Sequence, residues 1–330
     1  MSKSVEAKRA ISSGITSQGS VWANLKVLIT GGSGFIGGHL CQRLCDEGSE
    51  VHATSRRQRA TAGKGPIWWQ ADMADLTAVR RMLAAVRPDI VFHLAGSVGA
   101  SPDVALVLPT YQSHLSSTVN VLLGATEVGV RRIILADSYD VPGESEPTPS
   151  SPYAAAKWAA SGYGRMFHRL YQTPVLILRP FTTYGPAQAA TKLIPSVTLS
   201  LLKGEAPKVS SGRRMADWVY IGDVIEGFLA AAMSPEVGSN TIDLGSGSLV
   251  SIRDIVTTLV EVVGSQVEPL FGALPDRPAE YELAAETAAA ATTLGWRATT
   301  PLESGLRRSV EWYRRVLRLE SAKLAAVATE

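Results

Sequence analysis

Tyr153 and Lys157 lie four positions apart, so on a helix a phenol and an ammonium group would share one face. A tyrosine hydroxyl has a pKa of about 10, too high for efficient proton transfer at neutral pH. A neighbouring positive charge favours the phenolate and lowers that pKa. Ser138 precedes this segment and offers a hydroxyl that can hold a substrate oxygen. The three side chains predict acid–base chemistry, although many helices carry the Tyr–Lys spacing by chance.

The elements that must position these residues alternate between short apolar runs and longer amphipathic segments up to about residue 180. We expect strands at 25–30, 51–55, 67–71, 89–95, 132–136 and 175–178, and helices at 35–47, 76–86, 113–128 and 152–171. This rhythm is typical of βα repeats around a parallel sheet that is buried on both faces. The sequence therefore predicts an α/β fold, with Ser138 just after a strand and Tyr153 near the start of a helix.

After residue 180 the pattern changes, because prolines and glycines divide the chain into shorter elements. Helices are expected at 193–203, 223–233, 252–263 and 302–317. We interpret residues 25–180 as a nucleotide-binding domain to which some later elements return, and residues 181–330 mainly as a smaller second domain. Residues 1–24 lack a long apolar stretch, do not resemble a secretory signal and are expected to form a flexible tail.

The composition excludes several classes of function. The net charge of +2, from 32 basic and 30 acidic residues, gives no electrostatic footprint for nucleic acid. No apolar run approaches the roughly 20 residues that cross a bilayer, so we expect no membrane association. Cys41 and Cys45, the two cysteines, suit neither a disulfide framework nor a metal site; we expect them to pack as small apolar residues in a reducing cytoplasm. No other group has metal-ligand spacing, so no metal is expected.

A glycine-rich segment lies directly between the first expected strand and the first expected helix. Glycine is needed where such a turn is tight and where the backbone approaches a pyrophosphate, while the helix N-terminus offers N–H groups to the phosphates. Glycines also make ordinary turns, but the strand–loop–helix context favours a dinucleotide site. Its expected contacts are Gly31, Ser33, Gly34, Phe35, Ile36 and Gly37.

The end of the second expected strand indicates which nicotinamide cofactor is bound. Enzymes that use NAD place a carboxylate there, against the ribose hydroxyls. No acidic residue occurs from 51 through 71, where Ser55, Arg56 and Arg57 instead offer donors for a 2′-phosphate. We therefore predict a preference for NADP(H), with NAD(H) possible; the alternative is a solvated basic loop. Asp72 is a candidate for the adenine amino group or for the N-cap of the next helix.

Taken together, the motifs resemble the extended short-chain dehydrogenase/reductase family, in its nucleotide-sugar epimerase/dehydratase branch. They are TGGSGFIG at 30–37, HLAG at 93–96, YAAAK at 153–157, LRPFTTYGP at 178–186, ADWVYIGD at 216–223, PDRPAE at 275–280 and LGW at 294–296. The resemblance implies a doubly wound Rossmann sheet with a smaller C-terminal substrate-binding domain. It also implies a homodimer, formed here by helices 113–128 and 152–171, and a nucleotide-sugar substrate.

The same resemblance assigns roles to individual residues. Tyr153 exchanges a proton with a sugar oxygen, commonly at C4, Ser138 binds that oxygen, and Lys157 binds the nicotinamide ribose. Additional cofactor contacts are implied at Met73, Leu94, Ala95, Gly96 and Pro180, beside Tyr153 and Lys157 themselves. A contact with the substrate phosphates is implied at Arg277. Further candidates for substrate contacts are Ser97, Thr182, Lys192, Arg213 and Arg214, although Lys192 is more simply explained as a solvated surface lysine.

Some positions depart from the family pattern. Ala216 stands where an Arg commonly precedes Asp-Phe, so Arg213 or Arg214 would have to replace that phosphate contact. Thr182 and His114 each stand where Asn is common. These departures concern the substrate more than the cofactor.

Three functions are compatible with these residues. The first is NADPH-dependent reduction of the 4-keto group of a nucleotide-linked 4-keto-6-deoxyhexose, favoured because cells keep NADPH as a reductive pool. The second is a 4,6-dehydratase or 4-epimerase that recycles its cofactor; Asp140, two residues after Ser138, matches the acid that removes the C5 proton in dehydratases, or simply caps a turn. The third is a non-catalytic NADP(H)-sensing regulator, although such proteins often lose the Tyr or the Lys.

Overall fold

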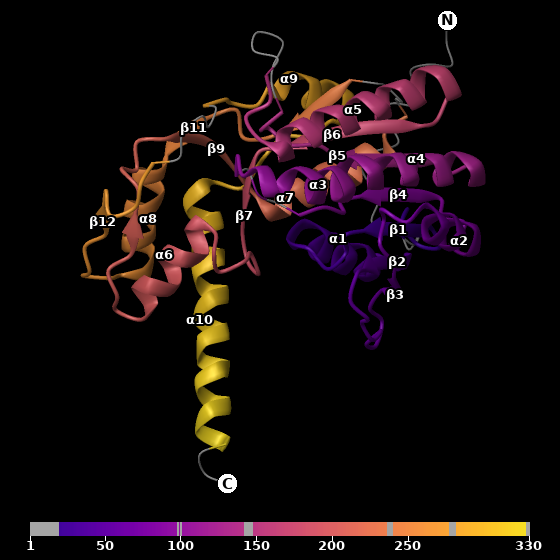
Figure 1. The fold of residues 1–330 in the computed structure, drawn as a ribbon. Coiled ribbons are helices and arrows are strands. Elements are labelled where there is room, and N and C mark those ends of the chain that lie inside the picture. Colours follow the sequence, from indigo (N-terminus) through magenta and orange to yellow (C-terminus); the bar gives the residue numbers. More distant parts are fainter. Residues whose placement is uncertain are drawn as a thin grey trace, which may run out of the picture.

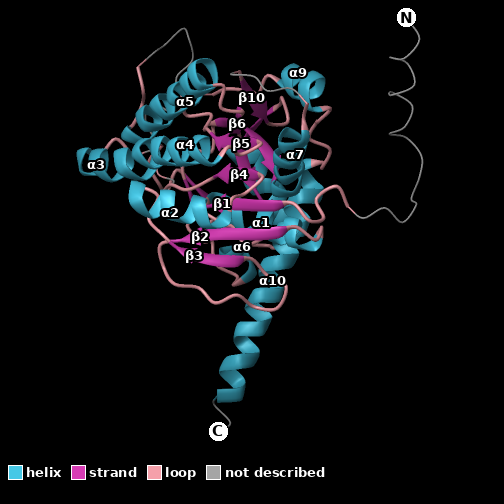
Figure 2. Cartoon of the chain, turned by 90° about the vertical axis from the view of Figure 1, so that its right-hand side faces the viewer, coloured by secondary structure: helices cyan, strands magenta, loops and turns pink. Residues whose placement is uncertain are grey.

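Seven parallel strands form the central sheet of the computed structural model, which describes residues 20–97, 99, 101–141, 148–235, 240–276 and 282–327 (Figure 2). Their order is β10-β6-β5-β4-β1-β2-β3. The bounds are β1 Lys26–Thr30, β2 Glu50–Ser55, β3 Ile67–Gln70, β4 Ile90–His93, β5 Arg132–Ala136, β6 Val175–Pro180 and β10 Thr241–Leu244. The sheet is doubly wound, with its order reversing between β1 and β4, as expected for a Rossmann fold.

Helices cover both faces of this sheet. On one face lie α1 (Phe35–Asp46) and α7 (Ile221–Met233), and on the other α2 (Leu76–Val86), α4 (Ser117–Val128) and α5 (Pro152–Tyr171) (Figure 2). Alternate residues of β1 serve the two cores: Val27 and Ile29 pack on the α1 side, and Leu28 packs on the α2 side. All three are fully buried, which explains the continuous hydrophobicity of the strand.

The helix that we expected at 113–128 begins earlier. A 3₁₀ turn, η2 (Val104–Leu106), leads into α3 (Val107–Thr110), a π-helical segment η3 (Tyr111–Ser116) and then α4. Pro109 lies in the first turn of α3, where the missing N–H removes no helical hydrogen bond. The apolar side chains of this early part remain exposed, so they provide no core signal in the sequence.

A second lobe follows β6. A three-stranded sheet orders β11 (Leu249–Ser251), β9 (Met215–Tyr220) and β7 (Thr182–Tyr184), and a small pair joins β12 (Leu270–Phe271) to β8 (Lys208–Val209). The helices α6 (Leu193–Leu202), α8 (Ile252–Val263) and α10 (Leu302–Val327) surround a separate core, and α10 extends away from it (Figure 1). The short elements α9 (Thr287–Ala289) and η4 (Ala290–Leu294) pack on the central sheet beside β10, as does α7.

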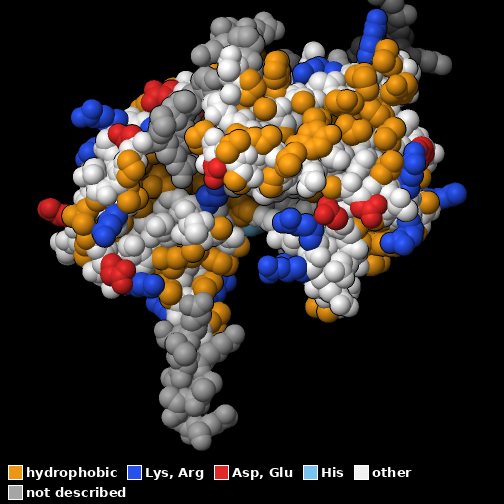
Figure 3. All heavy atoms as spheres, in the orientation of Figure 1, with side chains coloured by type: hydrophobic (Ala, Val, Ile, Leu, Met, Phe, Trp, Pro, Cys, Tyr) orange, Lys and Arg blue, Asp and Glu red, His pale blue; other side chains and the backbone are white. Residues whose placement is uncertain are grey.

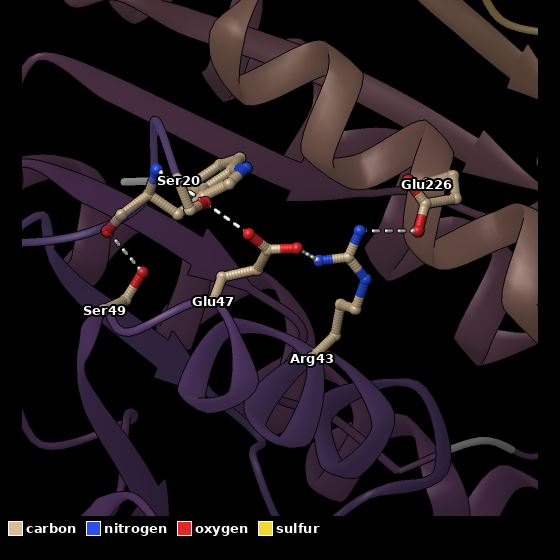
Figure 4. Close-up of polar contacts among 6 residues, drawn as sticks. Ser20, Arg43, Glu47, Ser49 and Glu226 are labelled. Atoms are coloured by element: carbon tan, nitrogen blue, oxygen red, sulfur yellow. Dashed lines mark hydrogen bonds and ion pairs between the residues drawn. The ribbon is translucent and has the colours of Figure 1, made fainter. Parts of the chain in front are cut away.

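The first described residues are anchored, which differs from the flexible tail expected for residues 1–24; residues 1–19 lie outside the described residues. Trp22 is only 5% exposed and packs in the core on the α1 side, because its large indole surface is best removed from water. Ser49 donates a hydrogen bond of 2.8 Å to its carbonyl oxygen. Ser20 contacts Glu47, whose partner Arg43 reaches Glu226 on α7 at 3.2 Å (Figure 4).

Candidate active site

The glycine loop after β1 has the geometry that a pyrophosphate requires. Gly31 has a φ of +71°, and a Cβ on it would lie 2.8 Å from the backbone of Leu94 and Ala95. A Cβ on Gly37 would collide with the Gly31 carbonyl oxygen. Gly34 begins α1 without any side-chain cap, so no side chain covers the N–H groups of the first turn. These residues fit a bound dinucleotide, with Ser33 exposed and Phe35 and Ile36 half-buried beside the loop.

The end of β2 adjoins this loop, since the Gly31 N–H donates to the Thr54 hydroxyl at 3.2 Å. Ser55 is buried and accepts a hydrogen bond of 3.2 Å from the Arg57 N–H, while the side chains of Arg56 and Arg57 are exposed. Cationic groups therefore project into solvent where a ribose-binding carboxylate would otherwise stand.

Asp72 does not cap the following helix, so that interpretation is wrong. Its carboxylate is exposed and accepts a hydrogen bond of 3.0 Å from the Ala74 N–H, which closes a local turn. Asp75 is the N-cap of α2, accepting from the N–H groups of residues 77 and 78. The contact of Asp72 with adenine stays a prediction, as does that of its buried neighbour Met73.

The end of β4 lies on the other side of the glycine loop. His93 contacts the hydroxyls of Thr30 at 2.7 Å and Thr118 at 3.0 Å, and burial lowers its pKa to about 3. It is therefore neutral at pH 7 and serves to connect these two hydroxyls. Leu94 and Ala95 follow half-buried, and Gly96 has a φ of +145° that places it against the His114 ring.

Ser138, Tyr153 and Lys157 meet where β5 ends and α5 begins. Ser151 caps α5 by accepting from the Ala154 N–H at 3.2 Å, which places Tyr153 in the first helical turn. Tyr153 is 6% exposed, and an interaction with the Ser138 side chain lowers the pKa of its hydroxyl, against the effect of burial. The Lys157 ammonium donates a hydrogen bond of 2.6 Å to the Ala136 carbonyl oxygen.

The electrostatics of the Tyr153 phenol differ from our expectation in one respect. Burial raises its pKa above the ordinary value, and the hydrogen bond with Ser138 opposes this increase. The neighbouring groups Asp140, Asp137 and Tyr139 raise it further. The Lys157 ammonium instead donates to the carbonyl end of β5. In the chain without a cofactor, the effect of burial on the pKa of Tyr153 therefore outweighs the decrease that we expected from Lys157.

Asp140 contacts the same serine. Its backbone N–H donates to the Ser138 hydroxyl at 3.3 Å, and that hydroxyl lies 3.2 Å from the Asp140 carboxylate. Asp140 therefore closes a turn and also lies within reach of the hydroxyl that we expect to bind substrate.

Tyr139 is a site residue that sequence reasoning missed. Its ring stacks on Phe181, with centroids 5.7 Å apart and planes 22° apart. Interactions with Thr182 and with Arg214, which precedes β9, lower the pKa of its hydroxyl, whereas burial raises it more. Thr182 and Arg214 are therefore close to the turn that contains Ser138. The adjacency of Tyr139 to Ser138 was the available signal.

His114 was noted as a departure from the family, but its position was not foreseen. The ring is 2% exposed and meets the Tyr153 ring edge-on, with centroids 5.0 Å apart. Its Nε2 bonds with the Ser97 carbonyl oxygen at 2.7 Å. Burial lowers its pKa to about 4, so the ring is neutral at pH 7 and braces both Tyr153 and the loop after β4.

The remaining expected substrate contacts are not brought together in the same way. Arg213 is exposed and its N–H donates to the Ser211 hydroxyl at 3.3 Å, while Lys192 is exposed just before α6. Arg277 lies outside the described residues. Ala216 lies buried on β9, and its methyl side chain offers no cation to a phosphate. Pro180 ends β6 beside Leu244, and its cofactor contact stays a prediction.

Within the described ranges, no three His, Cys, Asp or Glu side chains gather as metal ligands would. Among the helices that the structure describes, none has both the length and the apolar character needed to cross a bilayer.

Cys41 is buried and Cys45 half-buried near α7, as expected for small core residues, and burial raises the pKa of Cys41 to about 12.

The fold and these side chains define an extended short-chain dehydrogenase/reductase. The family model described as "NAD dependent epimerase/dehydratase family" matches residues 27–245. A UDP-glucose 4-epimerase of Mycolicibacterium smegmatis is 28% identical over 315 residues, covering 88% of this chain and 99% of that protein. A dTDP-D-glucose 4,6-dehydratase of Mus musculus is 27% identical, covering 88% and 89%. The structure of MoeE5 in complex with UDP-glucose and NAD matches with a TM-score of 0.80 and 29% identity, covering 88% and 99%.

The chain therefore belongs to the NAD-dependent epimerase/dehydratase family, whose nucleotide-sugar epimerases and dehydratases are oxidoreductase-type enzymes.

Proposed function

We propose that this chain is a nucleotide-sugar 4-epimerase that retains NADP(H) and uses Tyr153 as its acid–base group. The observation that carries the proposal is the pair of Tyr153 and Ser138, whose hydroxyls interact at the start of α5 and the end of β5, in a chain whose β1 is followed by the glycine loop. Epimerases and dehydratases among the relatives favour this activity over the keto-sugar reductase that the sequence first suggested, because none of the relatives described above is such a reductase.

Epimerisation requires few protein groups besides these residues. The bound nicotinamide supplies a reversible acceptor for the hydride. Tyr153 would act as the phenolate, which the positive charges of Lys157 and of a bound nicotinamide ring would favour. It would take the hydroxyl proton as the C4 carbinol becomes a ketone, and return it when C4 is reduced again from the other side. Ser138 holds the same oxygen, and His114 fixes the phenol from its edge. The net reaction consumes no proton and no reductant.

A 4,6-dehydratase is the second candidate, favoured by Asp140. Elimination of water needs a base at C5 and an acid for the departing hydroxyl, in addition to Tyr153. Asp140 is placed for one of these tasks through its contact with Ser138. Among the described residues the neighbouring Tyr139 phenol is a candidate for the other task, so epimerisation is the simpler use of the described side chains.

The preference for NADP(H) within this proposal rests on the end of β2. Two exposed guanidinium groups and Ser55 occupy the place of a ribose-binding carboxylate, and no acidic residue occurs between residues 51 and 71. Arginine binds phosphate through a planar fork of donors, which suits a 2′-phosphate.

The activities are separated by incubating the enzyme with UDP- and dTDP-linked hexoses and either cofactor. An epimerase yields a product of unchanged mass, without lasting change in nicotinamide absorbance, and proton NMR shows inversion at C4. Loss of one water would instead identify a dehydratase. Stoichiometric oxidation of NADPH by a keto-sugar would identify a reductase. Absence of binding to any nucleoside diphosphate would exclude all three.

We also propose that the enzyme is a homodimer. Large apolar side chains gather over the face that α3 and α5 form, where a second copy would remove them from water (Figure 3). The exposed members are Val104, Val107, Leu108, Tyr111, Trp158, Tyr163, Leu170 and Tyr171. The face thus begins earlier in the chain than the helix at 113–128 that we expected to form it.

Leu108→Asp should therefore convert the dimer into a monomer. Leu108 is 69% exposed, so a carboxylate is tolerated in the monomer but would be buried without a partner in the dimer. Light scattering measures the mass, for which one chain contributes 35.1 kDa. Leu319→Asp is the control, because Leu319 is 58% exposed on the distant α10. A wild-type monomer, or an L108D dimer, would contradict the proposal.

A further inference from the structure

Asp137 is a buried carboxylate that the mechanism above does not use. It is 8% exposed, and its backbone N–H donates to the Leu178 carbonyl oxygen at 2.7 Å, which fixes it between the ends of β5 and β6. The Ser161 side chain and the Ser138 backbone N–H act on the carboxylate to lower its pKa, against the effect of burial. The Oδ1 atom of Asp137 is buried and accepts no hydrogen bond from the described residues. Such an anion is costly unless a positive charge lies nearby.

Lys157 is the positive charge next to it. The ammonium donates to the carbonyl oxygen of Ala136, the residue before Asp137, at 2.6 Å. Lys157 and Ser161 are one helical turn apart on α5, so the face of that helix that carries them lies toward the end of β5. The Lys157 ammonium and the Asp137 carboxylate each oppose the effect of burial on the pKa of the other.

The other titratable groups around this pair do not replace Asp137. His93 on β4 and His114 on η3 are both neutral at pH 7, since burial and the Lys157 charge lower their pKa values to about 3 and about 4. Arg179 on β6 approaches Asp137 but is already paired with Asp243, at 2.7 and 3.0 Å. The phenol of Tyr153 carries no charge in the resting chain, because burial raises its pKa.

We propose that Asp137 is a positioning residue whose buried carboxylate keeps Lys157 in the charged, ammonium form at the carbonyl end of β5. The importance of that charge for turnover rests on the proposed function, whereas the electrostatic coupling itself does not.

The direction of the coupling follows from the two charges. Burial lowers the pKa of Lys157 and the Asp137 carboxylate raises it. Burial likewise raises the pKa of Asp137, and the Lys157 ammonium lowers it. Removing the carboxylate leaves desolvation unopposed, so the pKa of Lys157 should fall further.

The test measures the pKa of Lys157 directly by NMR, without substrate, in protein whose lysines carry ¹³C at Cε. The signal of Lys157 is identified by its absence from the Lys157→Met variant. Asp137→Asn should shift the Lys157 midpoint downward by about one unit or more, the size expected from loss of a nearby opposite charge. Asp137→Ser repeats the test with a smaller side chain, and a thermal melt shows which variants are folded. Ser161→Ala, which keeps the carboxylate, should shift it much less. Asp254→Asn, on α8, should not shift it.

An unchanged Lys157 midpoint in a folded Asp137 variant would overturn the inference. Turnover is measured separately as a pH profile. If the coupling matters for catalysis, the alkaline limb of kcat should move downward in D137N, and D137N should add nothing to K157M. A shifted midpoint in a protein that converts no nucleotide-sugar would support the inference and count against the proposed function alone.

Discussion

Replacing Tyr153 by Phe should lower kcat by about 10²- to 10⁴-fold, the usual contribution of a positioned acid–base group. The substitution removes one oxygen atom from a side chain that is 6% exposed and keeps its ring contact with His114, so the fold should be retained. Cofactor affinity should change little, because the glycine loop and the end of β2 are untouched. Steady-state rates on the accepted nucleotide-sugar and fluorescence titration with NADPH measure the two quantities.

Tyr163→Phe is the matched control, since Tyr163 is 41% exposed and lies more than two turns further along the same helix. It should keep wild-type activity. If Y153F itself kept full biological function, acid–base catalysis would be excluded and the fold would serve only to sense NADP(H).

Much of the fold could be predicted because local signals are strong where elements begin. The helices Leu76–Val86, Pro152–Tyr171 and Ile252–Val263 have the expected bounds, and each follows a capping side chain that accepts a backbone N–H: Asp75, Ser151 and Ser251. Contacts between distant segments left no comparable signal. The pairing of β10 with β6 and the burial of Trp22 both depend on residues far away in sequence.

The same difference between local patterns and distant contacts explains which parts of the site could be predicted. The glycine loop and the Tyr–Lys spacing are local patterns, so the sequence indicated them directly. The contact between Tyr139 and Arg214 joins residues on two lobes, and it depends on how β9 approaches the turn after β5. Asp137 could not be predicted for another reason. A carboxylate after a strand usually suggests a turn, and only the bond from Lys157 on α5 to the Ala136 carbonyl oxygen shows that Asp137 lies near this ammonium group.

The cofactor preference gives the other large expected effect. The double substitution Arg56→Ala and Arg57→Ala should weaken NADPH binding by about 10- to 100-fold, the loss of one charged hydrogen bond or somewhat more, and leave NADH affinity unchanged. The reason is that both guanidinium groups are exposed at the end of β2, where only the 2′-phosphate distinguishes the two cofactors. Calorimetric titration of each cofactor measures this difference at constant ionic strength.

Arg59→Ala is the control for this experiment, because Arg59 lies in the same basic segment but over the Trp68 ring, 5.1 Å from its centroid. It removes a similar charge without removing a donor at the strand end. An equal loss of affinity for NADPH in R59A would mean that general positive potential, and not a phosphate contact, governs binding. Equal affinities of the double variant and the wild type for both cofactors would mean that Arg56 and Arg57 belong to a solvated loop. The enzyme would then resemble MoeE5, whose structure contains NAD.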